Sequence, residues 1–203
     1  MKWIVWILAG ALVAACGGTR RPAEVAQYDF GHPAGKVGAA VASTFPLAAI
    51  DMQAASWLSG PAMHFRLAYA EPLRRQVYAE SRWAAPPAEL LGAFLKRRMI
   101  LGQADFSGSG CRLQMVLDEL EQRFDDPKNS RILLEARVLL TPLHGTTILS
   151  RRTFQIQKPA AAPAAREGVA AAREAAQSLA EELGGWLAEI ARDKPAVVER
   201  CRT

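Results

Sequence analysis

The chain has 203 residues, half of them hydrophobic, and a formal net charge of +5. This length suits one domain well and two only poorly. The positive excess is mild, and the basic residues are interspersed with acidic ones rather than gathered in a stripe, so charge does not point to a nucleic-acid partner.

The first fifteen residues have the pattern of an export signal. Lys2 supplies a positive charge, and residues 3–13 form an uncharged apolar run that is shorter than the roughly 20 residues a membrane-spanning helix needs. Small residues precede Cys16, and the segment ending there resembles the lipobox of bacterial lipoproteins, although Val13 stands where leucine is commonest. We therefore predict a signal peptide over residues 1–15 and lipidation of Cys16; an ordinary cleaved signal is the alternative.

Lipidation of Cys16 would hold the mature chain at a membrane, because several acyl chains anchor a protein durably whereas one binds only marginally. Residues 16–25 are predicted to form a lipidated tether, whose last nine residues reach at most about 30 Å. In the lipoprotein sorting pattern, an aspartate after the cysteine implies retention at the inner membrane. Gly17 and Gly18 stand there instead, which favours the outer membrane.

The remaining residues, 26–203, are expected to form a single domain. Strand-like segments come first: a short strand, an apolar run, and two segments with alternating hydrophobicity that we expect to pair as a hairpin, at residues 27–30, 46–52, 63–69 and 75–82. Pro86 and Pro87 then begin a helix that extends to Gly102, because proline in the first helical turn sacrifices no hydrogen bond.

Three longer strands joined by short turns follow the first helix and predict an antiparallel meander, at residues 113–124, 132–140 and 148–156. Hydrophobic positions change parity within the first of them, which predicts a bulge near Asp118 and Glu119.

A helix from Ala164 to Arg192 carries an apolar stripe, and Gly184 with Gly185 predicts a kink or a close approach there. The expected fold is α+β, a mixed and largely antiparallel β-sheet with two main helices packed on one face.

Cys111 and Cys201 remain once Cys16 is acylated. An even pair of cysteines in an oxidising compartment predicts a disulfide, and two unpaired thiols are the alternative.

Catalytic and metal-binding patterns are weak. His32, His64 and His144 have no partner at metal-ligand spacing, and the loop at residues 108–110 lacks the glycines of a nucleophile elbow or a phosphate loop. The carboxylates of Asp118, Glu119, Glu121, Asp125 and Asp126 are expected to be a solvated strand edge and turn. We predict no catalytic residue, no metal site, no cofactor and no enzymatic activity.

Arg82 and Trp83 stand where a strand leads into the first helix. The indole of Trp83 is expected to cap the core, while Arg82, on the opposite face, contacts a partner or braces the loop. An exposed sheet edge and the apolar residues Trp57, Leu58 and Met63 are further candidate contacts, and burial explains these three residues equally well.

Several short motifs together resemble the ABC-type transport auxiliary lipoprotein family, also called PqiC-like. They follow the lipobox in the family's order: Tyr28-Asp29-Phe30-Gly31, Met63-His64-Phe65-Arg66, residues 78–91 with Arg82-Trp83 and Pro86-Pro87, and the strand from Cys111 to Phe124-Asp125. Phe30 stands where the family often has leucine, and the alanine-rich segments around Ala40 and Ala160 are much less similar.

The resemblance implies a non-enzymatic accessory of an MCE-type lipid transport system, with an MCE-domain tunnel protein and an ABC transporter or permease as partners. A lipid-anchored domain would then dock the end of the tunnel protein at the outer membrane, and a homo-oligomeric ring is one form that the domain could take. The alternative is a carrier domain that holds an acyl chain between the sheet and the C-terminal helix.

Overall fold

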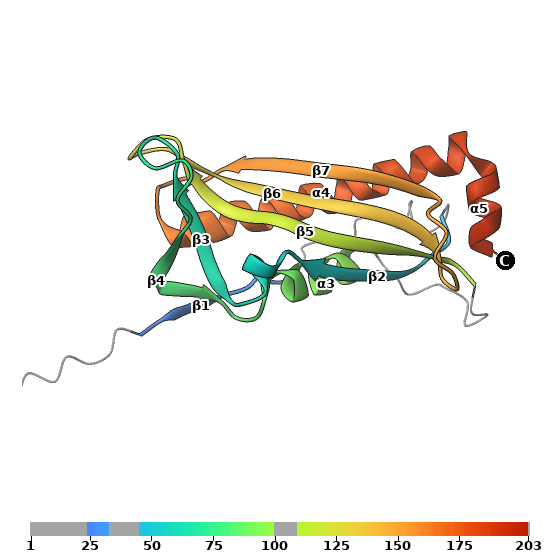
Figure 1. Ribbon diagram of the computed structural model, residues 1–203, viewed down its shortest axis with the longest axis horizontal. Coiled ribbons are helices and arrows are strands. Elements are labelled where there is room, and N and C mark those ends of the chain that lie inside the picture. The colour runs from blue at the N-terminus through green and yellow to red at the C-terminus, as the bar shows by residue number, and fades with distance from the viewer. Residues whose placement is uncertain (1–23, 33–44, 100–108, 203) are drawn as a thin grey trace, which may run out of the picture.

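The computed structural model of the protein describes residues 24–32, 45–99 and 109–202. The predicted signal peptide, Cys16, most of the tether and the predicted helix end at Gly102 lie outside these residues. Within them, the chain forms one mixed sheet with helices behind it (Figure 1), so the α+β prediction is confirmed.

The elements follow the predicted order, with shifts of a few residues at their ends. Strands β1 to β7 span Ala26–Tyr28, Leu47–Ala54, Ala62–Leu67, Gln76–Trp83, Cys111–Phe124, Ser130–Pro142 and Ser150–Pro159. The helices are α3 (Pro87–Arg98), α4 (Ala165–Asp193) and α5 (Pro195–Arg202), and a 3₁₀ turn, η2 (Ser56–Leu58), joins β2 to β3. We did not predict α5, a second helix that begins at Pro195.

One strand boundary was wrong. Ile148 was expected to begin the last strand, but it precedes β7 and is 53% exposed. The β6–β7 ladder begins only at the pair Leu140 and Ser150, so the residues between them form a longer connection than a tight turn.

The sheet order is β1-β4-β3-β5-β6-β7, and β2 lies beside β5 as well. The ladders β3–β4, β5–β6 and β6–β7 are antiparallel, which confirms the hairpin and the meander. The ladders β1–β4, β2–β5 and β3–β5 are parallel, so the sheet is mixed, and its two longest ladders are antiparallel.

The predicted bulge divides β5 into two halves. The β5–β6 register shifts between Leu117 and Glu119, which keeps Leu117 and Leu120 on the same buried face. On the other edge of β5, β2 pairs with the half before the bulge and β3 with the half after it. The chain passes from the first half of β5 to the second at η2. Just before η2, the backbone N–H of Ala55 donates to the carbonyl of Leu117 at 2.9 Å. One long strand therefore has two successive parallel neighbours.

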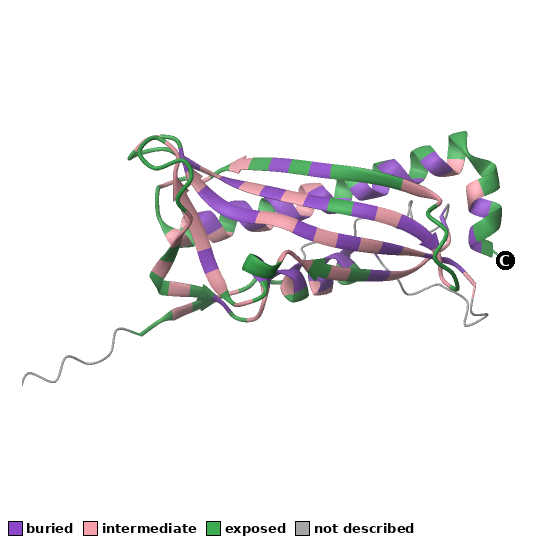
Figure 2. Cartoon of the chain, in the orientation of Figure 1, coloured by how far each residue is buried: buried purple, intermediate pink, exposed green. Residues whose placement is uncertain are grey.

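The hydrophobic core lies between the sheet and the helices. Buried side chains alternate with more exposed ones along β5 and β6 (Figure 2), except just after the bulge and near the end of β6, where consecutive residues are buried. α4 presents a fully buried stripe to the sheet: Ala172, Ala176, Leu179 and Leu183. α3 packs on β2, α4 packs on β6 and β7, and the two helices contact each other, so both cover the same face. α4 continues through Gly184 and Gly185, and an added Cβ at Gly185 meets no atom within 4 Å, so the predicted close approach is wrong there.

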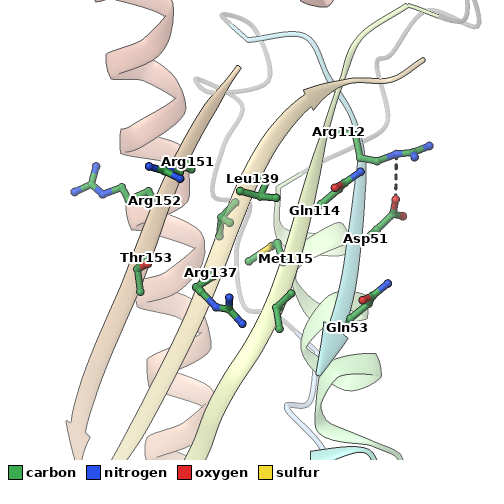
Figure 3. Close-up of a pocket in the computed structure, with 12 residues that line it drawn as sticks. Asp51, Gln53, Arg112, Gln114, Met115, Arg137, Leu139, Arg151, Arg152 and Thr153 are labelled. Atoms are coloured by element: carbon green, nitrogen blue, oxygen red, sulfur yellow. Dashed lines mark ion pairs between the residues drawn. The ribbon is translucent and has the colours of Figure 1, made fainter. Parts of the chain in front are cut away.

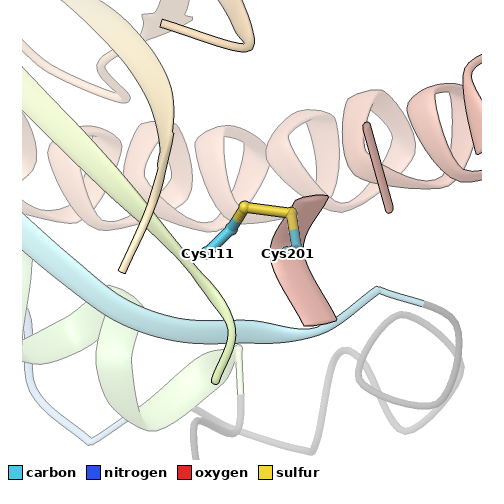
Figure 4. The surroundings of a disulfide bond; sticks show 2 residues. All are labelled: Cys111 and Cys201. Carbon is cyan, nitrogen blue, oxygen red and sulfur yellow. A yellow bond between two sulfur atoms is a disulfide. The ribbon is translucent and has the colours of Figure 1, made fainter. Parts of the chain in front are cut away.

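Cys111 and Cys201 form a disulfide, as predicted, and it ties the start of β5 to α5 (Figure 4). Both cysteines are fully buried. Gly110, just before β5, has a φ of 137°, and an added Cβ would lie 2.6 Å from the Cβ of Ala48. A side chain there would separate the starts of β2 and β5, which explains the glycine.

Candidate docking surface

The face of the sheet opposite α3 and α4 is covered by none of the described helices. Its strands are in register, so side chains form rows across them. One row runs Asp51, Gln114, Leu139, Arg151, and the next runs Gln53, Val116, Arg137, Thr153. We call the surface formed by these two rows and Arg112 the concave face.

The concave face holds a pocket of about 770 Å³ that is open to solvent on one side (Figure 3). The Nε of Arg112 lies 3.0 Å from the Oδ2 of Asp51. The Nε and Nη2 of Arg137 donate to the two carboxylate oxygens of Asp118 at 2.6 and 2.7 Å. Arg151 is exposed and has no ion pair or side-chain hydrogen bond with any described residue. Two of the three arginines are thus neutralised by a neighbour, and Arg151 is not.

A second group of arginines lies toward the other end of the same face. Arg66, Arg123 and Arg131 occupy one row across β3, β5 and β6. The single Nε–H of Arg66 is shared between the two carboxylate oxygens of Glu121, and Asp125 pairs with Arg131. The Nε of Arg123 is buried without a hydrogen-bond partner among the described residues. Like charges directly opposite each other on neighbouring strands destabilise a sheet.

His64 lies beside the arginine row, where η2 meets β3. Its Nε2 is 3.0 Å from the carbonyl oxygen of Trp57. Burial lowers the pKa of the His64 imidazole, and the positive charge of Arg75 lowers it further. Arg75 also lies over the indole of Trp57 and donates two hydrogen bonds to Glu119, which raise the pKa of Arg75. These contacts connect η2 to β3 and, through Arg75, to β5.

The predicted contact residues separate into buried and exposed ones. Trp83 is 4% exposed and stacks on Phe30 with ring centroids 5.2 Å apart, so its indole belongs to the core as expected. Arg82 is exposed. Leu58 and Met63 are buried, whereas Trp57 is 52% exposed. Arg82 and Trp57 are therefore the members of this set that a partner can reach.

The five carboxylates predicted to form a solvated strand edge and its turn lie on β5 and in the turn after it, and those on the strand form ion pairs. Asp118, Glu119, Glu121 and Asp125 pair with Arg137, Arg75, Arg66 and Arg131, and Asp126 accepts hydrogen bonds from the Lys128 and Asn129 backbones. Hydrogen bonds, first from the Asn129 side chain, lower the pKa of Asp126. The described residues contain no group of three or more potential ligands able to hold a metal ion.

The alternative of an acyl chain between the sheet and the C-terminal helix finds no support in the contacts of α4. Five buried alanines bring α4 close to the strands: Ala171, Ala172, Ala175, Ala176 and Ala180. At Gly168 an added Cβ would lie 2.0 Å from the Oε1 of Gln122 on β5. The side chains of α4 and the sheet therefore pack directly against each other along this stretch.

Comparison with known proteins identifies the family of this chain. The chain belongs to the family described as the ABC-type transport auxiliary lipoprotein component, whose model matches residues 64–184. The matched region contains β4 to β7 and most of α4, and hence the strands that carry most of the concave face. The resemblance recognised from the sequence motifs is thereby confirmed, and the family description names an auxiliary component of transport.

Solved structures agree with this assignment. A crystal structure of a Xanthomonas campestris protein of the family DUF330 matches with a TM-score of 0.62 at 20% identity, covering 86% of this chain and 96% of that one. A second, titled only as an uncharacterized protein, matches with a TM-score of 0.55 at 16% identity, covering 84% and 98%. At these identities the likeness shows the fold alone. No curated protein matches the chain. Every described helix is too short or too polar to cross a bilayer.

Proposed function

We propose that the protein is a periplasmic lipoprotein, anchored in the outer membrane through Cys16, that docks the tunnel component of an MCE-type lipid transport system. The family assignment supports a role beside an ABC-type transporter. The lipobox before Cys16 supports the anchor, and Gly17 with Gly18 supports the outer membrane. The observation that carries the proposal is a sequence resembling a lipobox in a chain of this transport family, whose described residues present the exposed Arg151 but no catalytic constellation.

The buried disulfide is consistent with the compartment. Disulfides persist in the periplasm and are rare in the cytosol. Because residues 17–25 reach at most about 30 Å, the domain that begins at β1 would remain close to the membrane surface. A short reach suits a component that positions a partner against the bilayer.

Fractionation of the native envelope tests the anchor. The wild-type protein should have the intact mass of an acylated Cys16 and should be found with the outer membrane. Cys16→Ala should lose the acyl mass, and Gly17→Asp should keep it but move the protein to the inner-membrane fraction. An unmodified thiol at Cys16, or wild-type protein in the inner membrane, contradicts the proposed anchor.

Co-purification tests the partner. The acylated protein, solubilised in mild detergent, should retain an MCE-domain tunnel protein that a non-lipoprotein control bait does not retain. Wild-type protein that co-purifies with the transporter of another system, or with no MCE-domain protein, refutes the docking role even if the anchor is confirmed.

A further inference from the structure

The concave face has an excess of positive charge at its centre. Arg112, Arg137 and Arg151 project from it, and Asp51 is the acidic residue that lines the pocket with them. Arg152 borders the pocket as well, with its guanidinium directed toward α4. The remaining polar side chains, Gln53, Gln114 and Thr153, can donate hydrogen bonds. A cavity that holds more cations than anions, with neutral donors between them, is complementary to an acidic ligand.

Arg151 and Arg137 are placed to act together. Arg151 stands opposite Leu139, and Arg137 is two positions further along β6, so the two arginines are diagonal neighbours on the same face. Diagonal neighbours in a sheet have Cα atoms about 7–8 Å apart, a distance that two guanidinium groups can bridge to one carboxylate. Because Asp118 already holds Arg137 and no described residue neutralises Arg151, an incoming carboxylate gains most at Arg151.

Polar and apolar atoms contribute about equally to the lining of the pocket. Val116 and Leu139 are the outward-facing apolar side chains in its two rows, and donors surround them. An acyl chain needs a continuous apolar channel, which this floor does not provide. A polypeptide suits it better, because the donors can satisfy both its acidic side chains and its backbone carbonyl groups.

We propose that the concave face binds an acidic segment of a protein partner, with Arg151 as its principal charge contact. This inference rests on the proposed docking function and specifies the chemistry of the surface that would perform it. The interface is then polar and salt-dependent, since the exposed arginines act through electrostatic attraction that ions screen.

Binding of a labelled octaglutamate peptide to the full-length lipoprotein in detergent, followed by fluorescence anisotropy at low salt, tests the proposal. Arg151→Gln should weaken the affinity about 5- to 10-fold, and Arg151→Glu should weaken it further. Octalysine should not bind. Raising the salt concentration to 0.5 M should abolish binding.

Arg152→Gln is the matched control, because it removes the same charge one residue away on the opposite face. The guanidinium of Arg152 lies 5.3 Å from the ring centroid of Phe154 and pairs with Glu189 of α4. Arg152 also borders the pocket, but its guanidinium is directed toward Glu189 of α4. This variant should therefore bind octaglutamate within about twofold of the wild type. Arg151 is exposed, so its variants should keep the wild-type melting temperature.

Three results overturn the inference. Equal loss in Arg151→Gln and Arg152→Gln means that net charge alone attracts the peptide. Unchanged affinity in Arg151→Gln means that the peptide binds elsewhere. Arg151-dependent binding to phosphatidylglycerol vesicles without binding to octaglutamate means that the face recognises a lipid headgroup. These measurements use purified protein, so they can fail while the anchor and the co-purification succeed, and the reverse also holds.

Discussion

Opening the disulfide is expected to remove a large share of the stability of the domain. Cys111 and Cys201 are 90 residues apart in sequence, so the bridge closes a long loop in the unfolded chain. In the chain-entropy model a loop of this length lowers the entropy of the unfolded state by an amount equivalent to about 4.6 kcal/mol at 25 °C. Because a domain is typically stable by about 5–15 kcal/mol, the reduced protein should be marginal.

Urea unfolding of the mature chain carrying Cys16→Ser measures this effect. Since both cysteines are fully buried, the bridge should be reduced in the unfolded state and the protein refolded with the reductant present. The free energy of unfolding should fall by about 3–5 kcal/mol on reduction. Comparing oxidised and reduced forms of one sequence avoids the packing change that substitution of Cys111 and Cys201 by alanine adds. A difference below about 1 kcal/mol would refute the loop-closure reasoning.

Three further predictions concern the core and the arginine row. Gly168→Ala should destabilise the domain by about 1–2 kcal/mol, because its Cβ would displace the buried amide of Gln122. Gly185→Ala in the same helix should be neutral or stabilising by up to about 1 kcal/mol. Urea unfolding measures both variants, and equal effects would contradict the packing argument. The pKa of His64 is lower in the folded state than its ordinary value of 6.5, so the unfolded chain takes up a proton first as the pH falls below 6.5. The stability of the domain should therefore decrease in that pH range. In thermal melts, a His64→Gln variant should lose this part of the pH dependence. Arg123→Met should stabilise the protein by about 0.2–1 kcal/mol in urea unfolding, because it removes the middle charge of three arginines in register. Destabilisation would show that the row is not repulsive.

Much of the local structure could be predicted from the sequence. The change of parity between Leu117 and Leu120 predicted the bulge, and the alternation in β5 and β6 predicted which side chains are buried. The apolar stripe predicted α4 to within one residue at each end. These predictions succeed because burial on one face imposes a period of two on a strand and 3.6 on a helix, and neighbouring residues alone carry that signal.

The candidate site was less accessible to prediction. Arg82 and Trp83 were chosen from a short motif, and the structure places Trp83 in the core, while Arg151 was passed over. What distinguishes Arg151 is the lack of an acidic neighbour across the strands, and the partners of Arg137 and Arg112 come from other parts of the chain. The alternation in β7 could have shown that Arg151 faces away from the helices, but not that it is unneutralised.

The sequence by itself predicted an export signal and lipidation at Cys16, the succession of strands and helices as far as α4, and the pairing of Cys111 with Cys201. Each of these predictions depends on composition, on the number of cysteines or on the order of nearby residues. Only the tertiary structure decided that β2 and β3 share one edge of β5, and that two rows of side chains meet in the concave face. Both depend on pairing between segments that are tens of residues apart. The physical reason is that such pairing depends on the free energy of the whole sheet, which cannot be inferred from any short segment of the sequence alone.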